Sequence, residues 1–193
     1  MPKTVQFDID DVLTRAMHVF WRYGYRATTM RALADATGIQ AGSIYNTFGG
    51  KRGLFLQALA HYDRVHREIP LAELAVWPSP RQAVMAAFEG AVAAVLEDGS
   101  QDGCMAVNLA LELSPHDEEV SVVVARAFAG MEAFLRDAIE RGQACGEISR
   151  AVDPGATARA LLALFLGLRV LARSRPEEQL LRDVARQAEV LLA

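Results

Sequence analysis

Hydrophobic residues recur along this chain at spacings of three and four, which is the period of a helix with one buried face. The sequence contains no alternating strand pattern of useful length and no internal repeat. The pattern predicts nine helices, at about residues 9–23, 29–36, 40–48, 51–69, 80–97, 104–113, 115–139, 154–172 and 176–192. We therefore expect an all-α fold.

Residues that begin or end helices mark the predicted boundaries. Gly24 stands where the first helix should end, and Pro70 is expected to end the fourth because proline breaks the hydrogen-bond ladder. Ser79 and Asp153 each directly precede a proline, which is typical of an N-cap followed by the first helical turn. Residues 98–103 are predicted to form a polar loop.

The length and composition favour a globular chain. Its 193 residues can bury a sizeable core without disulfides or a metal, and 52% hydrophobic with 23% charged residues excludes disorder. Two cysteines without a CxxC pair fit a reducing cytoplasm. The longest apolar run, residues 160–168, is too short to cross a bilayer, and residues 1–4 do not resemble a signal peptide. We therefore expect a cytoplasmic location and no membrane partner.

The net charge of −4 conceals an uneven distribution. Residues 1–67 carry nine Lys and Arg against five Asp and Glu, whereas residues 68–193 carry eleven against nineteen. A basic first third on an acidic remainder favours a local surface for an anion such as nucleic acid. Chance clustering of charge is the alternative.

The residue types of common catalytic and metal sites do not fall at the required spacings. The four histidines form no i,i+4 pair and no zinc-type cluster with the cysteines. Gly50-Lys51 lacks the upstream glycine and the following Ser or Thr of a phosphate-binding loop, and neither GxSxG nor a strand-borne GxGxxG occurs. We expect no enzyme activity, no catalytic residue, no metal and no cofactor.

The second and third predicted helices, joined by a tight turn at Gly38, follow the plan of a helix-turn-helix. Leu33, Ile44 and Phe48 can form the small core that fixes the angle between them. The other side of the third helix carries small or short uncharged residues that suit base edges or a close approach to DNA. These candidate DNA contacts are Gln40, Ala41, Gly42, Ser43, Asn46 and Thr47.

Hydroxyl, ammonium and backbone N–H groups at helix starts and edges suit phosphate oxygens. The candidates for such contacts are Thr28, Thr29, Tyr45 and Lys51. Each also has a purely structural interpretation. The threonines can be helix caps, the tyrosine a core ring, and the lysine a solvated side chain at a helix start.

Residues 7–66 resemble the DNA-binding domain of the TetR family of bacterial transcriptional repressors. The matching residues are Ala16, Phe20, Gly24, Tyr25, Thr28, Thr29, Met30, Arg31, Leu33, Ala34, Thr37, Gly38, Ile39, Gly42, Ser43, Ile44, Tyr45, Phe48, Lys51 and Leu54. In that family the first three helices bind DNA, the third reads the major groove, and the residues matching Tyr45 and Lys51 contact phosphates. The chain departs from the family pattern at Ala41, Thr47 and Gly53, where a basic residue or proline, an aromatic residue and an acidic residue are common.

The resemblance implies a DNA-binding domain at residues 1–50, a linking helix at 51–69, and a ligand-binding and dimerisation domain at 70–193. It also implies a homodimer joined by the last two helices, whose wide apolar faces favour burial against a second chain; a monomeric core is the alternative. Candidate interface residues are Leu161, Phe165, Leu168, Leu181, Val184 and Leu192. Two recognition helices would then meet the half-sites of a palindromic double-stranded DNA operator, about 34–36 Å or a multiple apart.

Polar and polarisable residues interrupt the apolar faces and are candidates to bind an unidentified small-molecule effector. They are Tyr62, Trp77, Met85, Phe88, Cys104, Met105, Asn108, Met131 and Phe134. Plain core packing is the alternative for the methionines and phenylalanines. Asn108 stands apart, because an amide on an otherwise apolar helix needs a hydrogen-bond partner.

The segment Gly103-Cys104-Met105 with Asn108 resembles one found in a branch of TetR-like regulators, some of which sense electrophiles through cysteine. Cys104 is predicted to begin a helix, where the helix dipole favours the thiolate, although buried cysteines are commonly just small hydrophobic residues. We expect a ligand-responsive DNA-binding repressor. The alternatives are a cysteine-based electrophile or redox sensor and a helical binding module that has lost DNA recognition.

Overall fold

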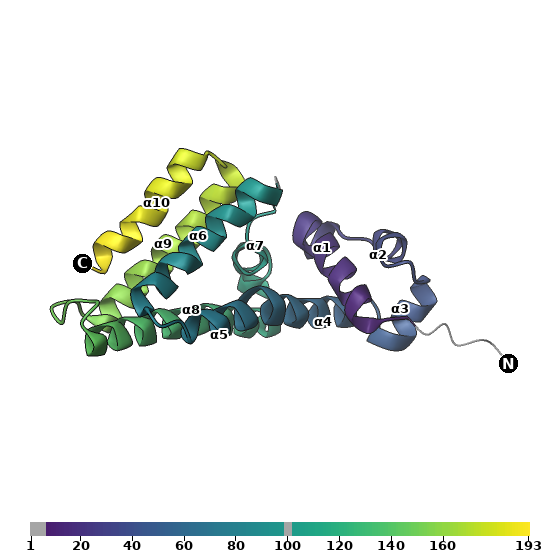
Figure 1. The fold of residues 1–193 in the computed structure, drawn as a ribbon. Coiled ribbons are helices and arrows are strands. Elements are labelled where there is room, and N and C mark those ends of the chain that lie inside the picture. Colours follow the sequence, from purple (N-terminus) through teal and green to yellow (C-terminus); the bar gives the residue numbers. More distant parts are fainter. Residues whose placement is uncertain (1–6, 99–101) are drawn as a thin grey trace. The chain divides into compact units, whose positions relative to one another are not determined.

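The computed structural model describes residues 7–98 and 102–193, and no strand occurs in these two ranges. The helices are α1 (Ile9–Ala27), α2 (Met30–Thr37), α3 (Ala41–Phe48), α4 (Lys51–Asp63), α5 (Ile69–Ala75), α6 (Pro80–Asp98), α7 (Met105–Glu112), α8 (Glu118–Cys145), α9 (Pro154–Ser174) and α10 (Glu178–Leu191) (Figure 1). A π-helical turn, Arg64–Glu68, joins α4 to α5, and a 3-10 turn, Ser114–His116, precedes α8. The predicted all-α fold is confirmed.

The prediction that Pro70 ends a helix is wrong. Pro70 lies in the first turn of α5, and α4, the π-turn and α5 form one helical stretch that ends at Ala75. Proline donates no hydrogen bond and its ring crowds the carbonyl four residues earlier, so a wider π-turn just before it relieves both problems. With this stretch counted once, the helices of the described residues occupy the nine predicted places.

Most predicted helix ends match the structure. Ser79 and Asp153 cap α6 and α9, each accepting a hydrogen bond from the backbone N–H three residues later. Gly24 interrupts α1 with φ 78° and ψ 168°. Asp117 caps α8, so the helix begins later than the predicted start at residue 115, which lies in the 3-10 turn. Residues 1–4 and part of the predicted loop at 98–103 lie outside the described residues.

The chain separates into two compact units, Met1–His66 and Arg67–Ala193, and the predicted linking helix at 51–69 spans the division. In the first unit α1 packs along α4 and against α2, while α3 packs against α2 and α4. The Phe20 and Phe55 rings meet edge to face at 5.1 Å, and Leu33 and Ile44 are fully buried beside the turn between α2 and α3. This core holds α3 at a fixed angle.

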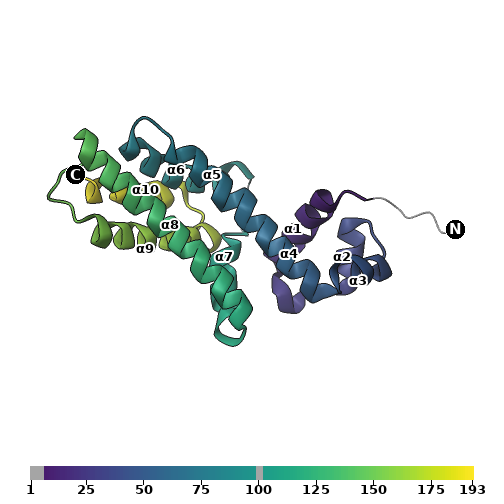
Figure 2. The same ribbon diagram turned by 90° about the horizontal axis from the view of Figure 1, so that it is seen from below.

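In the second unit α6, α8, α9 and α10 form a bundle, to which α5 and α7 are added (Figure 2). The bundle shares one apolar core, where the Phe88 and Phe165 rings meet edge to face at 5.4 Å. Arg141 on α8 donates hydrogen bonds to the carbonyls of Ala75 and Trp77, which holds the end of α5 against α8. The second unit therefore has a helical core of its own.

One helix among the described residues, α9, has the length and mean hydropathy, 1.6 over 18 residues, of a membrane-spanning segment. The helix as a whole thus meets a length and composition criterion that the apolar run at residues 160–168 was expected to fail. Arg159 and Arg169, which bound the apolar run in the sequence, do not interrupt the helix. Core helices of soluble proteins meet the same criterion, but only 22% of this window is buried within the chain. Much of the surface of α9 is thus left uncovered by its own chain.

Candidate nucleic-acid interface

The corner between α2 and α3 depends on the residues at the two ends of α2. Thr29 caps α2, with its hydroxyl accepting a hydrogen bond from the Ala32 N–H at 3.1 Å. Gly38 ends α2 in the left-handed conformation, at φ 73°, and its N–H donates to the Ala34 carbonyl at 3.0 Å. Glycine adopts this conformation without the steric cost that a side chain brings. The predicted tight turn is therefore present, and α3 begins at Ala41.

One side of α3 is buried and the other is open to solvent. Ile44 and Phe48 pack into the core of the first unit, beside Leu33. The opposite side forms a ridge of small and uncharged residues, all exposed except the half-buried Ser43: Gln40, Ala41, Gly42, Ser43, Asn46 and Thr47. We call this set the recognition ridge. Its polar side chains are of the kind that hydrogen-bond to base edges in a major groove.

Tyr45 and Lys51 lie where α3 ends and α4 begins. Tyr45 is 60% exposed, and its ring lies against Gly50, where a Cβ would come within 2.8 Å of the ring atom Cε1. Lys51 donates from Nζ to the Arg26 carbonyl at 3.5 Å, and its ammonium lies 4.4 Å from the centre of the Tyr25 ring. Of the two candidate phosphate contacts, Tyr45 is thus positioned by Gly50 and Lys51 by the Arg26 carbonyl at the end of α1.

The two neighbouring threonines have different environments. Thr28 is buried, and its hydroxyl donates a 2.6 Å hydrogen bond to the Gly24 carbonyl. Its proton is therefore not available to a phosphate, which corrects the prediction that this side chain contacts DNA. Thr29 is exposed at the N-terminus of α2, so its predicted phosphate contact remains a prediction.

Gly53, one of the departures from the family pattern, has a structural reason. It lies in the first turn of α4, where a Cβ would overlap the carbonyl oxygen of Phe48 at the end of α3. Any side chain at this position would force these two backbone segments apart. The departure therefore reflects packing of α3 against α4 and gives no sign of lost DNA recognition.

The nine candidate ligand residues do not gather in one cavity. Phe134 lines a groove between α5 and α8, and Met85 lines another between α6 and α10. Tyr62 is buried in the first unit, with its ring centre 4.9 Å from that of Trp21. Buried side chains among the remaining candidates are Phe88, Met105 and Met131.

Of the three further candidates, two lie next to helix ends and the third, Asn108, lies within α7. Trp77 is partly exposed in the turn after α5, and Cys104 is half-buried at the N-cap of α7. Asn108 has the partner that its position demands, since its Nδ2 donates to the Asp102 carbonyl at 2.9 Å. In the described ranges no three His, Cys, Asp or Glu side chains are grouped to hold a metal ion.

Four of the six predicted interface residues are buried within their own chain. Leu161, Leu168, Leu181 and Leu192 have no exposed surface, because they fill the core between α6, α8, α9 and α10. This corrects the prediction that they contact a second chain: the period of the apolar face identifies a buried stripe but not what covers it. The other two, Phe165 and Val184, are half-buried.

Comparison with known proteins agrees with this geometry. Residues 12–58 match the family described as "Bacterial regulatory proteins, tetR family", and residues 80–188 match "Tetracyclin repressor-like, C-terminal domain". The chain is 30% identical to the uncharacterized HTH-type transcriptional regulator YezE of Bacillus subtilis over 95% of both chains. It is 29% identical to the HTH-type transcriptional repressor ComR of Escherichia coli, over 93% of this chain and 86% of ComR.

A solved structure shares the fold over the whole length. It is a cysteine variant of the TetR family transcriptional regulator CifR complexed with 26-bp double-strand operator DNA. The TM-score is 0.87 at 31% identity, with 99% of this chain and 100% of that chain covered. The protein therefore belongs to the TetR family and is a DNA-binding transcriptional regulator.

Proposed function

We propose that the protein is a cytoplasmic, homodimeric repressor that binds a palindromic operator through α3 and is released by a small-molecule effector bound in the second unit. The observation that carries the proposal is the recognition ridge, which is exposed on one side of α3 while Ile44 and Phe48 anchor the other side. We assign the protein no catalytic role and no cofactor. Its close relatives include a repressor, and CifR was solved on its operator.

Within this proposal the contacts divide into two kinds. Gln40, Asn46 and Thr47 read base edges, because amides and hydroxyls offer both donors and acceptors to the major groove. Thr29, Tyr45 and Lys51 hold phosphates and thus set the register of α3 on the duplex without reading sequence. Gly42 leaves open space on the recognition ridge, because it has no side chain and nothing lies within 4 Å of the place where its Cβ would stand.

The uncovered surface of α9 supports the proposed homodimer. Small and apolar residues follow one another on exposed positions of this helix at spacings of three and four: Ala160, Ala163, Gly167 and Val170. On α10, Leu180 and Val184 are half-buried and Leu191 is 38% exposed. Pairing these two helices with their counterparts in a second copy would form a four-helix interface with two-fold symmetry. That symmetry is what a palindromic operator requires.

The dimer is tested by sedimentation velocity on two matched variants. Ala163→Arg places a charge on the exposed side of α9, and Ala125→Arg places the same charge on an exposed position of α8. We expect the first variant to sediment as a monomer and the second as a dimer. A dimeric Ala163→Arg variant would contradict the proposed interface.

The repressor activity is tested by fluorescence anisotropy with duplex DNA from upstream of the protein's own gene and with a scrambled duplex. We expect tighter binding to the upstream duplex, and affinity for both should fall by about a thousandfold or more between about 50 and 200 mM salt. Equal affinity for the two duplexes, with little dependence on salt, would favour a helical module that has lost DNA recognition.

A cysteine sensor is the second candidate for effector response. Cys104 is half-buried at the N-cap of α7, and the residue before it is held by the Arg169 guanidinium, which donates to the Gly103 carbonyl at 3.0 Å. An adduct on Cys104 would therefore press on a loop that is tied to α9. N-ethylmaleimide should release DNA from wild type and from Cys145→Ser but not from Cys104→Ser. Release from Cys104→Ser would remove this candidate.

A further inference from the structure

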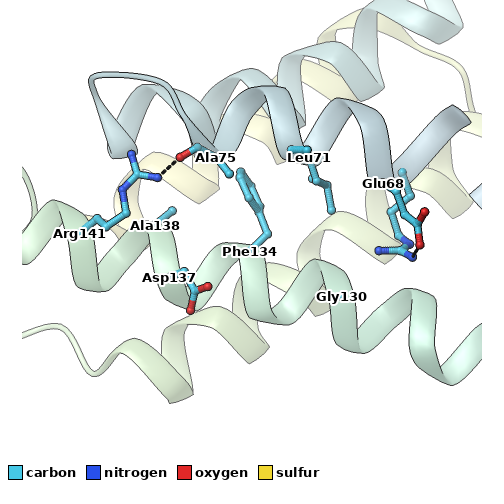
Figure 3. A pocket seen from close by; sticks show the side chains of 10 residues that line it. Glu68, Leu71, Ala75, Gly130, Phe134, Asp137, Ala138 and Arg141 are labelled. Carbon is cyan, nitrogen blue, oxygen red and sulfur yellow. Dashed lines mark hydrogen bonds and ion pairs between the residues drawn. The ribbon is translucent and has the colours of Figure 1, made fainter. Parts of the chain in front are cut away.

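The groove between α5 and α8 lies wholly within the second unit and has a volume of about 290 Å³. Its floor is apolar and comes from both helices. Figure 3 shows the Phe134 ring pointing toward α5, beside Leu71 and Ala75, with Ala138 one turn further along α8. An arginine stands at each end, Arg67 at one and Arg141 at the other.

The charge of Arg67 is matched by a neighbouring carboxylate. Its guanidinium lies 3.2 Å from the Glu68 Oε1 and only 19% of its side chain is exposed. Gly130 on α8 makes room for it, because a Cβ there would overlap the guanidinium. This end of the groove is therefore occupied by an ion pair.

Arg141 has a different environment. Its guanidinium donates to the carbonyls of Ala75 and Trp77, which carry no net charge. Among the described residues no carboxylate forms an ion pair with it, and Asp137, one turn before it, pairs with Arg136 at 3.9 Å. Figure 3 shows the Asp137 side chain pointing away from α5. A guanidinium has five N–H donors, so three remain after the two carbonyls.

We propose that this groove binds a small amphipathic monocarboxylate, with the carboxylate paired to Arg141 and the apolar part lying along Leu71, Phe134 and Ala138. A half-buried guanidinium without an anionic partner favours a carboxylate, because charge-assisted hydrogen bonds are about twice as strong as neutral ones. An apolar floor with a few charged groups at its edges is typical of small-molecule sites, and the volume of about 290 Å³ lies just below their usual range of about 300–1,000 Å³.

This groove would be the effector site of the proposed function. Carboxylate binding itself does not depend on the proposed function, whereas the expected effect of that binding on DNA affinity rests on it. Arg141 also fastens the end of α5 to α8, so a carboxylate that bonds to its guanidinium would pull on the contact that positions α5. A ligand shifts the DNA-binding equilibrium only if it binds the two states with different affinities.

Calorimetric titration without DNA tests the site, with octanoate, 4-phenylbutyrate and salicylate as carboxylate probes and octanol and octylamine as matched controls. We expect at least one carboxylate to bind, and octanol to bind about tenfold more weakly than octanoate if octanoate is that ligand. Arg141→Gln should weaken the carboxylate about tenfold or more, while Arg141→Lys should retain part of the affinity. Arg136→Gln, on the exposed side of the same helix, should bind like wild type.

A second variant, at a different residue, keeps the test decisive if Arg141→Gln does not fold. Ala72 is exposed at the groove, so Ala72→Trp fills it without entering the core and should abolish carboxylate binding. Absence of binding by all three carboxylates at millimolar concentration would overturn the inference, as would equal losses in Arg136→Gln and Arg141→Gln. Carboxylate binding that leaves operator affinity unchanged would support the site and contradict its proposed role as the effector site.

Discussion

Replacing Gly53 by alanine should destabilise the first unit, although alanine is normally the better helix former. Gly53 lies in the first turn of α4, and the space that a Cβ needs is occupied by the Phe48 carbonyl oxygen. Because the obstacle is a backbone atom, it cannot move aside by rotating a side chain. The end of α3 would have to move away from α4, together with the buried Phe48 ring.

Two opposing effects decide how much Gly53→Ala changes the free energy of unfolding. Alanine is favoured over glycine in a helix by about 1 kcal/mol, whereas forcing an extra methyl group into a filled site costs about 1–3 kcal/mol or more. The overlap is with backbone, so we take the upper part of that range and expect a net loss of about 2 kcal/mol. Gly42 on α3 is the matched control. Its Cβ would meet nothing within 4 Å, so Gly42→Ala should gain up to about 1 kcal/mol.

Thermal unfolding followed by circular dichroism at one protein concentration measures both effects. For a chain of this length 1 kcal/mol corresponds to about 2–4 °C in Tm, so Gly53→Ala should melt about 4–8 °C below wild type. Gly42→Ala should melt at or above wild type, yet bind operator DNA more weakly because its methyl group stands on the recognition ridge. A Gly53→Ala protein as stable as Gly42→Ala would refute the reasoning.

Three further predictions concern DNA contacts and a helix cap. Tyr45→Phe and Lys51→Ala should each weaken binding to all duplexes in an anisotropy assay, and Lys51→Ala should lower the slope of log affinity against log salt by about one. Asn46→Ala should relax the preference at one base position by about 1–3 kcal/mol, measured on a panel of single-base operator variants. Asp153→Ala should lose about 1 kcal/mol in urea unfolding, because the Asp153 carboxylate caps α9 with a 2.6 Å hydrogen bond from the Ala156 N–H.

Each of these has a result that would count against it. A wild-type salt slope for Lys51→Ala would mean that the Lys51 ammonium does not contact a phosphate. Uniform loss over all operator variants would make Asn46 a positioning residue that reads no base. An Asp153→Ala protein with wild-type stability would mean that water replaces the cap at no cost.

The sequence predicts the first unit well because local rules govern its folding. The kink at Gly24 and the helix boundaries at Thr29 and Gly38 follow from backbone conformation and capping chemistry, and the exposed side of α3 follows from the period of Ile44 and Phe48. For Thr28 the sequence left a helix cap and a phosphate contact open, and the hydrogen bond to the Gly24 carbonyl favours the structural role.

The second unit is harder to predict because its apolar stripes pack in three dimensions. Leu161 and Leu181 look like interface residues in the sequence, but α6 and α8 cover them within the same chain. The α5–α8 groove was missed for a different reason. Pro70 predicts a helix end, so the continuation to Ala75 and its contact with Arg141 are not visible in the sequence.

Selection of random double-stranded DNA by the purified chain, followed by sequencing, tests most directly whether α3 reads DNA as one of a symmetric pair. We expect an inverted repeat whose half-site centres lie about 10 bp or a multiple of that apart. The enrichment should disappear for the variant that combines Gln40→Ala, Asn46→Ala and Thr47→Ala on the ridge. Enrichment of an asymmetric site, or an inverted repeat that survives this triple variant, would contradict the assignment of α3 as the reading helix.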